Sequence, residues 1–193
     1  LHKEYRRQRQ MCIRDRIKNI NFENVDINRS GQNQIATVGF NLKNKGLIED
    51  VKVGSITGNN DVAGIVNKID EDGKIENVAF VGKIDSIGNN STVGGIAGSN
   101  YMGFVNRAYV DATITAQNAN ASMLVPFVTY MLNSWKSGTK AKVTNSVAKG
   151  VLDVKNTRNV GGIVAKTWPY GAVQDNVTYA KVCLLYTSPS PRD

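Results

Sequence analysis

Residues Gly73–Ala97 read Gly-Lys-Ile-Glu-Asn-Val-Ala-Phe-Val-Gly-Lys-Ile-Asp-Ser-Ile-Gly-Asn-Asn-Ser-Thr-Val-Gly-Gly-Ile-Ala, and this stretch decides the fold. Apolar residues alternate with polar ones in short runs, for example at Ile75, Phe80 and Ile84. Alternation with a period of two is typical of half-buried β-strands, and glycines punctuate the bends between them. The stretch therefore predicts short strands joined at glycine corners.

The same pattern recurs along the chain. Its copies are Gly46–Ile56 with Val62–Val66, Val105–Ile114 with Leu124–Phe127, and Val143–Leu152 with Val160–Val164, flanked by weaker half-copies at Phe22–Ile27 and Val173–Val177. The first apolar residue of each copy serves as a marker, and the markers are Phe22, Ile48, Ile75, Val105, Val143 and Val173. Their intervals are 26, 27, 30, 38 and 30 residues. Repeats of this length indicate a solenoid, in which each unit needs stacked neighbours to bury its apolar face.

The repeats are rich in Val, Ile, Gly and Asn and lack the regularly spaced leucines of leucine-rich repeats. This composition favours strands over helices. We therefore predict an all-β fold, a parallel β-helix (β-solenoid) of about five to six coils. The 38-residue interval predicts one aromatic-rich excursion from the coils.

The second residue after each marker is expected to form a ladder at one corner of the stack. These positions hold Asn24, Asp50, Asn77, Arg107, Asn145 and Asp175. Asn and Asp side chains readily hydrogen-bond nearby backbone groups at turns. The predicted structural corner ladder is therefore Asn24, Asp50, Asn77, Asn145 and Asp175, and Arg107 interrupts it.

The two ends of the chain differ from the repeats. One set of permitted codons for Cys183–Ser188 has a complementary strand that encodes Met-Cys-Ile-Arg-Asp, which is the sequence of Met11–Asp15. Both ends resemble the translated transposase adapter of DNA sequencing libraries. We therefore expect residues 1–16 and 183–193 to be adapter-derived and disordered, and residues 17–182 to be the repeat domain, itself a fragment. A genuine basic arm and tail is the alternative.

The composition of residues 17–182 excludes several kinds of chemistry. His2, Cys12 and Cys183 all lie in the flanking segments, so the repeat domain has no histidine or cysteine for a metal site, a thiol nucleophile or a histidine-containing triad. We expect no catalytic residues, no metal site and no cofactor in this fragment. Of the net charge of +8, the flanking segments carry 7 − 3 = +4. The remaining +4 forms no basic cluster with interleaved aromatics, so no nucleic-acid partner is expected, and no apolar run is long enough for membrane insertion.

Two aromatic segments are candidate partner-binding sites. Ser122–Trp135 is expected to begin as a closing strand and to continue as an apolar extension carrying Tyr130 and Trp135, with room for one or two helical turns. Thr167–Gly171 forms an aromatic turn with Trp168 and Tyr170. Such residues either pack against the coils or stay exposed, where they stack on sugars or anchor a protein partner. The sequence leaves both alternatives open.

The repeat unit Gly73–Val78 followed by Val93–Gly98 resembles the GLUG-type repeat of Gram-positive surface proteins. The segments Val93–Thr115, Leu124–Tyr130 and Lys166–Asn176 are similar to the N-terminal, non-catalytic region of the streptococcal immunoglobulin A protease family of zinc metallopeptidases. This resemblance implies a secreted, cell-wall-attached virulence protein, whose zinc is bound by an HExxH helix in another domain. It also implies a host glycoprotein substrate such as immunoglobulin A and contacts with the remaining domains of the parent. This chain has no HExxH, so no catalytic or metal residue is assigned.

Three functions follow in order of preference. The first is a non-catalytic spacer and substrate-docking scaffold of such a zinc metalloendopeptidase. The alternative is a repeat module of a bacterial surface adhesin that binds host protein or glycan. A carbohydrate lyase or hydrolase ranks last, because Asp111, Asp153 and Asp175 fall at unrelated repeat positions and such chemistry needs paired carboxylates or a basic catalytic group.

Overall fold

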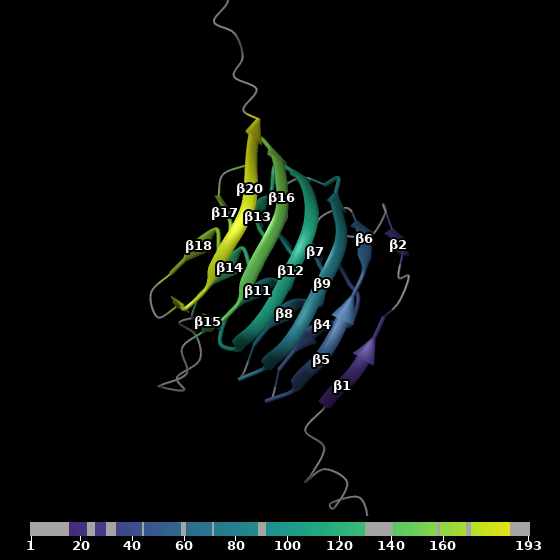
Figure 1. The fold of residues 1–193 in the computed structure, drawn as a ribbon, viewed down its shortest axis with the longest axis vertical. Coiled ribbons are helices and arrows are strands. Elements are labelled where there is room, and N and C mark those ends of the chain that lie inside the picture. Colours follow the sequence, from purple (N-terminus) through teal and green to yellow (C-terminus); the bar gives the residue numbers. More distant parts are fainter. Residues whose placement is uncertain are drawn as a thin grey trace, which may run out of the picture.

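The fold is seen in a computed structural model. The structure describes residues 16–22, 26–29, 34–43, 45–58, 61–70, 72–88, 92–129, 141–157, 159–168 and 171–185. These residues form strands and turns, with no helix among them. The long strands β1 (Arg16–Asn21), β5 (Leu47–Val53), β9 (Lys74–Ser86), β12 (Phe104–Gln117), β16 (Val147–Lys155) and β20 (Val177–Leu185) lie side by side and run in the same direction (Figure 1).

The largest sheet, sheet A, contains ten of the described strands. They are β1 (Arg16–Asn21), β2 (Asp26–Arg29), β5 (Leu47–Val53), β6 (Ser55–Gly58), β9 (Lys74–Ser86), β12 (Phe104–Gln117), β15 (Lys142–Thr144), β16 (Val147–Lys155), β19 (Ala172–Gln174) and β20 (Val177–Leu185). Sheet A is continuous because each repeat pairs in parallel with the repeats before and after it.

Two smaller sheets of short strands complete each coil. Sheet B holds β3 (Gln34–Ala36), β7 (Asp61–Ala63), β10 (Thr92–Gly94), β13 (Asn120–Ser122) and β17 (Val160–Gly161). Sheet C holds β4 (Gly39–Leu42), β8 (Val66–Ile69), β11 (Ala97–Asn100), β14 (Phe127–Val128) and β18 (Lys166–Thr167). Both sheets pair in parallel, coil on coil.

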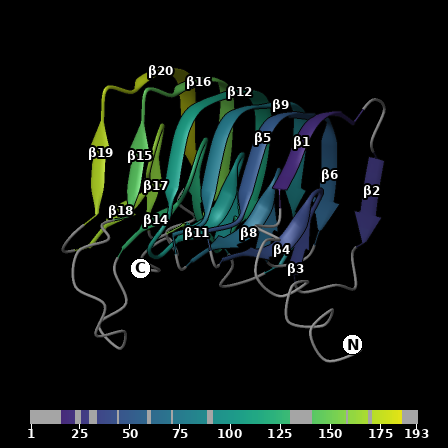
Figure 2. The same ribbon diagram turned by 90° about the horizontal axis from the view of Figure 1, so that it is seen from below.

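The chain thus passes through sheets A, B and C in turn and then starts again. Five coils result, at residues 16–42, 47–69, 74–100, 104–128 and 142–167, and β19 and β20 begin a sixth. Figure 2 shows the coils side by side in sequence order, from purple to yellow. The predicted all-β parallel solenoid is confirmed.

The core fills the space enclosed by the three sheets. Val51, Val78 and Ile96 are buried, as the alternating pattern predicts. Equivalent inward positions of successive coils stack on one another, as in the buried column Ile56, Ile84, Ile114 and Leu152. Full burial of each such side chain contributes roughly 1.5–3 kcal/mol, and no coil achieves it without its neighbours.

The corner between sheets B and C holds a glycine in the second and third coils, at Gly64 and Gly95, whereas Thr37 and Met123 occupy it in the first and fourth coils. The Gly95 amide donates to the Met123 carbonyl of the next coil at 3.0 Å. A Cβ on Gly95 would meet that same carbonyl oxygen, and one on Gly64 would meet the carbonyl of Gly95. The Gly-Gly pair at residues 94 and 95 therefore lets the coils approach closely.

The marker of the first coil lies earlier than the predicted Phe22. Strand pairing places Ile17 opposite Ile48, and the other markers pair in the predicted register. Phe22 directly follows β1, and its amide donates to the Lys52 carbonyl at 2.9 Å. The segment Phe22–Val25 is identical to Ile75–Val78 at three of its four positions, but this local likeness does not set the register. The first interval is therefore 31 residues, from Ile17 to Ile48, instead of 26.

Two strands extend beyond residues 17–182 into the flanking segments. Arg16 lies in β1 opposite Leu47, and Cys183–Leu185 extend β20 along β16. Parallel pairing uses backbone groups that every non-proline residue has, so a strand continues through residues of any origin. The rest of segments 1–16 and 183–193 lies outside the described residues.

The aromatic-rich excursion is described only at its start. Met123, Leu124 and Val125 are buried in the core, and β14 follows as the closing strand. The expected helical extension falls in residues 130–140, outside the described part of the chain.

Candidate functional site

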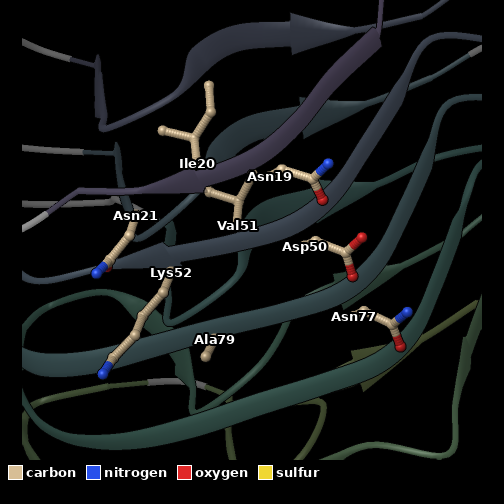
Figure 3. A pocket seen from close by; sticks show the side chains of 8 residues that line it. All are labelled: Asn19, Ile20, Asn21, Asp50, Val51, Lys52, Asn77 and Ala79. Atoms are coloured by element: carbon tan, nitrogen blue, oxygen red, sulfur yellow. The ribbon is translucent and has the colours of Figure 1, made fainter.

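Two corners of the solenoid carry the residues that the sequence analysis selected. At the first corner, within sheet A, strand pairing aligns Asp50, Asn77, Asn145 and Asp175 with Arg107. Asn19 occupies this position in the first coil, opposite Asp50. Asn24, the predicted member, lies outside the described residues. Figure 3 shows Asn19, Asp50 and Asn77 in a row on successive strands.

The backbone explains this residue choice. All six ladder residues have a positive φ, between 51° and 57°. Most side chains disfavour this left-handed conformation, whereas Asn and Asp tolerate it. Ladder side chains also hydrogen-bond to other side chains. For example, Asn145 Nδ2 donates to Asn106 Oδ1 at 2.9 Å. The ladder is thus a structural device that turns the chain at the same place in each coil.

Arg107 departs from the ladder in residue type but keeps its geometry, with a φ of 53°. Its Nε donates to Asn77 Oδ1 at 2.5 Å, and its Nη2 pairs with Glu76 Oε1 at 2.6 Å. These two bonds attach the Arg107 guanidinium group to the preceding coil. The corner is therefore continuous at Arg107, whereas the sequence suggested an interruption there.

Beside the ladder lies a shallow depression of about 340 Å³, lined by Asn19, Ile20, Asn21, Asp50, Val51, Lys52, Asn77 and Ala79 (Figure 3). Its polar lining consists of ladder residues and their strand neighbours. The charged residues in this lining are Asp50 and Lys52.

The second corner is where each coil passes from sheet C to sheet A. We call it the lysine–aromatic edge and define it by Lys68, Lys74, Tyr101, Phe104, Lys142, Lys166 and Trp168. Phe104 lies between two lysines, with Lys74 Nζ 5.8 Å and Lys142 Nζ 6.0 Å from its ring centroid. These distances fall within the range of cation–π attraction.

Tyr101 and Trp168 extend this arrangement along the same corner. Each follows the sheet C strand of its coil, and each amide donates to a carbonyl of the coil before, Ile69 for Tyr101 and Val128 for Trp168. Lys68 Nζ lies 4.7 Å from the Tyr101 ring, and Lys166 Nζ lies 5.0 Å from the Trp168 ring. Every cation–π contact among the described residues thus occurs at this edge.

Trp168 is 53% exposed, so the structure places it on the surface. Of the two readings left open by the sequence, exposure and packing, Trp168 follows the first. The other three candidate residues, Tyr130, Trp135 and Tyr170, lie outside the described residues.

A second depression, of about 400 Å³, opens at the start of the edge. Its lining is Arg16, Lys45, Leu47, Asp72, Lys74 and Phe104. Three cationic side chains face one carboxylate here, so the electrostatic potential of this depression favours anions.

The outer face of sheet A carries a small polar cluster. Lys149 Nζ lies 3.2 Å from Asp111 Oδ2, and the Tyr109 hydroxyl donates to the same oxygen at 3.2 Å. The hydrogen bond and charge of Asp111 raise the pKa of Lys149. Asp111 lies opposite Lys149, and Lys149 precedes Asp153 by four residues on β16. The carboxylates of Asp111 and Asp153 are therefore roughly 13 Å apart along the strand direction. Asp175 belongs to the corner ladder. The three aspartates are therefore not brought together.

The described residues provide no group of three or more His, Cys, Asp or Glu side chains that could hold a metal ion. They include Cys183 but no histidine. Zinc sites in proteins are built from several His, Cys or carboxylate ligands, and this part of the chain does not fit one. Nor does any helix long and apolar enough to span a membrane occur in the described ranges.

The sequence analysis missed the lysine–aromatic edge. Its signal lies one residue before each marker, where Leu47, Lys74, Phe104, Lys142 and Ala172 occupy one column. Cations and an aromatic alternate in the middle of this column. Their significance depends on stacking residues that are 30 and 38 positions apart, which only the register establishes.

The comparisons with known proteins agree with the predicted resemblance. No protein-family model matches the chain. The zinc metalloprotease ZmpB of Streptococcus pneumoniae serotype 4 is 52% identical to it over 169 residues, which is 86% of the chain. The chain spans about 9% of the length of this curated relative. The chain is therefore homologous to a segment of a streptococcal zinc metalloprotease.

Proposed function

We propose that the chain is a non-catalytic β-solenoid segment of a secreted, cell-wall-attached zinc metalloendopeptidase, in which it acts as a spacer and substrate-docking scaffold. The observation that carries this proposal is the 52% identity to a zinc metalloprotease, in a chain whose residues 17–182 contain no histidine or cysteine. Zinc and the general base belong to another part of the parent protein.

The architecture supports a spacer role. Parallel coils stack about 4.8 Å apart, so five coils extend roughly 24 Å along the solenoid axis. Buried columns run through successive coils, and a packed core resists compression. Such a stack sets a fixed distance between the segments on either side of it and presents its corners in a regular array.

The non-catalytic part of the proposal is tested with the purified chain. Incubation with Zn²⁺ and immunoglobulin A, the substrate class that the family resemblance implies, is expected to leave the antibody intact on a denaturing gel. Zinc-dependent cleavage that a chelator abolishes would contradict the proposal.

The docking part is tested in the pneumococcal relative, by deleting the segment that matches this chain. Docking predicts that kcat for a short peptide substrate stays unchanged, while KM for an intact protein substrate rises. Equal loss of activity on both substrates would indicate a disturbed catalytic domain. Unchanged activity on both would eliminate docking and leave only the spacer.

A repeat module of a surface adhesin is the second candidate, and the exposed Trp168 favours it. In that case the reading frame downstream contains further repeats and an anchoring motif without HExxH. Host glycoprotein should then bind the isolated chain, and Trp168→Ala should weaken binding without a change in the melting temperature.

A further inference from the structure

The lysines of the lysine–aromatic edge retain their charge on the surface. Lys68 pairs with Asp70 at 3.0 Å. Lys74, Lys142 and Lys166 are exposed, and within the described ranges they form no ion pair with a carboxylate. Aromatic rings lie beside them instead. A ring attracts an ammonium group without neutralising it, so these lysines are held in place while their charge remains available.

These charges form a line along the solenoid axis. Lys74 and Lys142 both pair with Phe104, in the coils on either side of it, so their Cα atoms are about 10 Å apart at two inter-strand spacings. Lys45 extends the line toward the first coil, where it lines the 400 Å³ depression with Lys74. Arg16 also lines this depression, but it belongs to the expected flanking segment and pairs with Glu49 at 3.8 Å. Asp72 is the one carboxylate in that lining. Cations thus occur at this corner in the first, second, third and fifth coils, the fourth coil contributes Phe104, and the turn before Lys74 carries Asp70 and Asp72.

We infer that the lysine–aromatic edge is a binding site for an anionic polysaccharide, a glycan with carboxylate or phosphate groups repeated along its length. A linear polymer with repeated charges matches a linear array of ammonium groups. Trp168, which is 53% exposed at the far end, offers a flat apolar ring against which a sugar ring can pack. The inference does not depend on whether the parent is a protease.

An acidic peptide is less well suited to this edge. Peptides often bind by adding a strand to an open sheet edge. The strands that flank this corner in the middle coils, such as β11 and β12, are already paired on both sides. A peptide would have to rely on charge alone, whereas a glycan also uses the exposed ring.

The test measures binding of the full chain to fluorescein-labelled polygalacturonate, a carboxylated polysaccharide, by fluorescence anisotropy. Phosphomannan distinguishes phosphate from carboxylate, neutral dextran controls for uncharged glycan, and poly-L-glutamate represents an acidic peptide. The wild-type chain is expected to bind one or both anionic glycans, with affinity that falls between about 50 mM and about 300 mM NaCl because salt screens exposed charges. Dextran should not bind.

Two variants with the same change in net charge locate the site. The edge variant combines Lys45→Gln, Lys74→Gln and Lys142→Gln. The control variant combines Lys52→Gln, Lys155→Gln and Lys181→Gln, three exposed lysines away from the edge. The edge variant should lose about tenfold or more in affinity, because three cationic contacts with the glycan are removed at once. The control variant should lose less than about threefold.

Trp168→Leu separates glycan from peptide. It should weaken binding of the anionic glycan and leave poly-L-glutamate unaffected. Melting curves of all variants show whether each remains folded. Equal loss in the two triple variants, or no binding of either anionic glycan, would overturn the inference. The edge would instead be assigned to an acidic peptide if poly-L-glutamate binds tightly and Trp168→Leu changes neither its affinity nor that of the glycan.

Discussion

The middle coils and the sixth coil share one sequence pattern but differ in burial. Leu152 on β16 is fully buried, whereas Leu184 on the adjacent strand β20 is 46% exposed. Val182, which pairs with Leu152, is also exposed. The difference arises because β16 has a neighbouring strand on each side and β20 pairs only with β16 among the described strands. In a solenoid, burial is a property of neighbours, so equal residues contribute unequally to stability.

The same substitution in both regions tests this comparison most directly. Leu152→Ala is expected to lower the free energy of unfolding by about 3 kcal/mol, since it opens a cavity in the core. Leu184→Ala should change it by less than about 0.5 kcal/mol, as is usual for surface positions. Urea denaturation measures both. Similar losses for the two variants would show that β20 is covered in solution, for example by a second copy of the chain.

A glycine pair sharpens the comparison at the corners. A Cβ on Gly95 would meet the Met123 carbonyl oxygen, whereas one on Gly39 has nothing within 4 Å. Gly95→Ala should therefore destabilise the fold by about 2–3 kcal/mol through overpacking, and Gly39→Ala by less than about 0.5 kcal/mol. If thermal unfolding shows no difference between the two variants, the coils do not approach as closely as the structure indicates.

The corner ladder allows a test within a single position. Asn77→Ala should lower the free energy of unfolding by about 1 kcal/mol more than Asn77→Gly does, because alanine disfavours the left-handed backbone and glycine does not. Both variants lose the bond from Arg107, so the difference between them isolates the backbone. If chemical denaturation shows that Asn77→Ala is as stable as Asn77→Gly or more stable, the assigned left-handed conformation is contradicted.

The smallest expected effect concerns pH. Asp111 raises the pKa of Lys149 above its ordinary value of 10.5. A raised pKa means that the contact stabilises the fold fully below pH 10.5 and ceases to do so as the pH rises through the folded-state value. The melting temperature of the wild-type chain should slightly exceed that of Lys149→Gln at pH 9, and the gap should close at strongly alkaline pH. A difference in melting temperature that increases at alkaline pH would contradict the raised pKa of Lys149.

Much of the fold was predictable from the repeat. Five markers, from Ile48 to Val173, lie in one column as predicted, because alternation and glycine punctuation are properties of single coils. The marker of the first coil, Phe22, was not assigned correctly. The four residues Phe22–Val25 are similar in sequence to the start of a repeat. The correct marker, Ile17, is the first residue after the predicted flanking segment 1–16.

The candidate site was predicted less well, for a physical reason. Trp168 was selected because it lies in an aromatic turn, and the structure places Lys166 Nζ 5.0 Å from its ring centroid. Lys74 and Lys142 were not selected at all, because a lysine at one point of the sequence is an ordinary solvated charge. They become an array only after Phe104 is placed between them.

The sequence by itself determined that the chain forms stacked β-coils and that residues 17–182 lack the histidine and cysteine ligands of a zinc site, since both conclusions depend on residue type and local spacing. Only the tertiary structure decided which residues share a corner, why Arg107 belongs to the ladder and where the free lysines align. Those properties depend on the register between coils about 30 residues apart, which backbone pairing and core packing fix together.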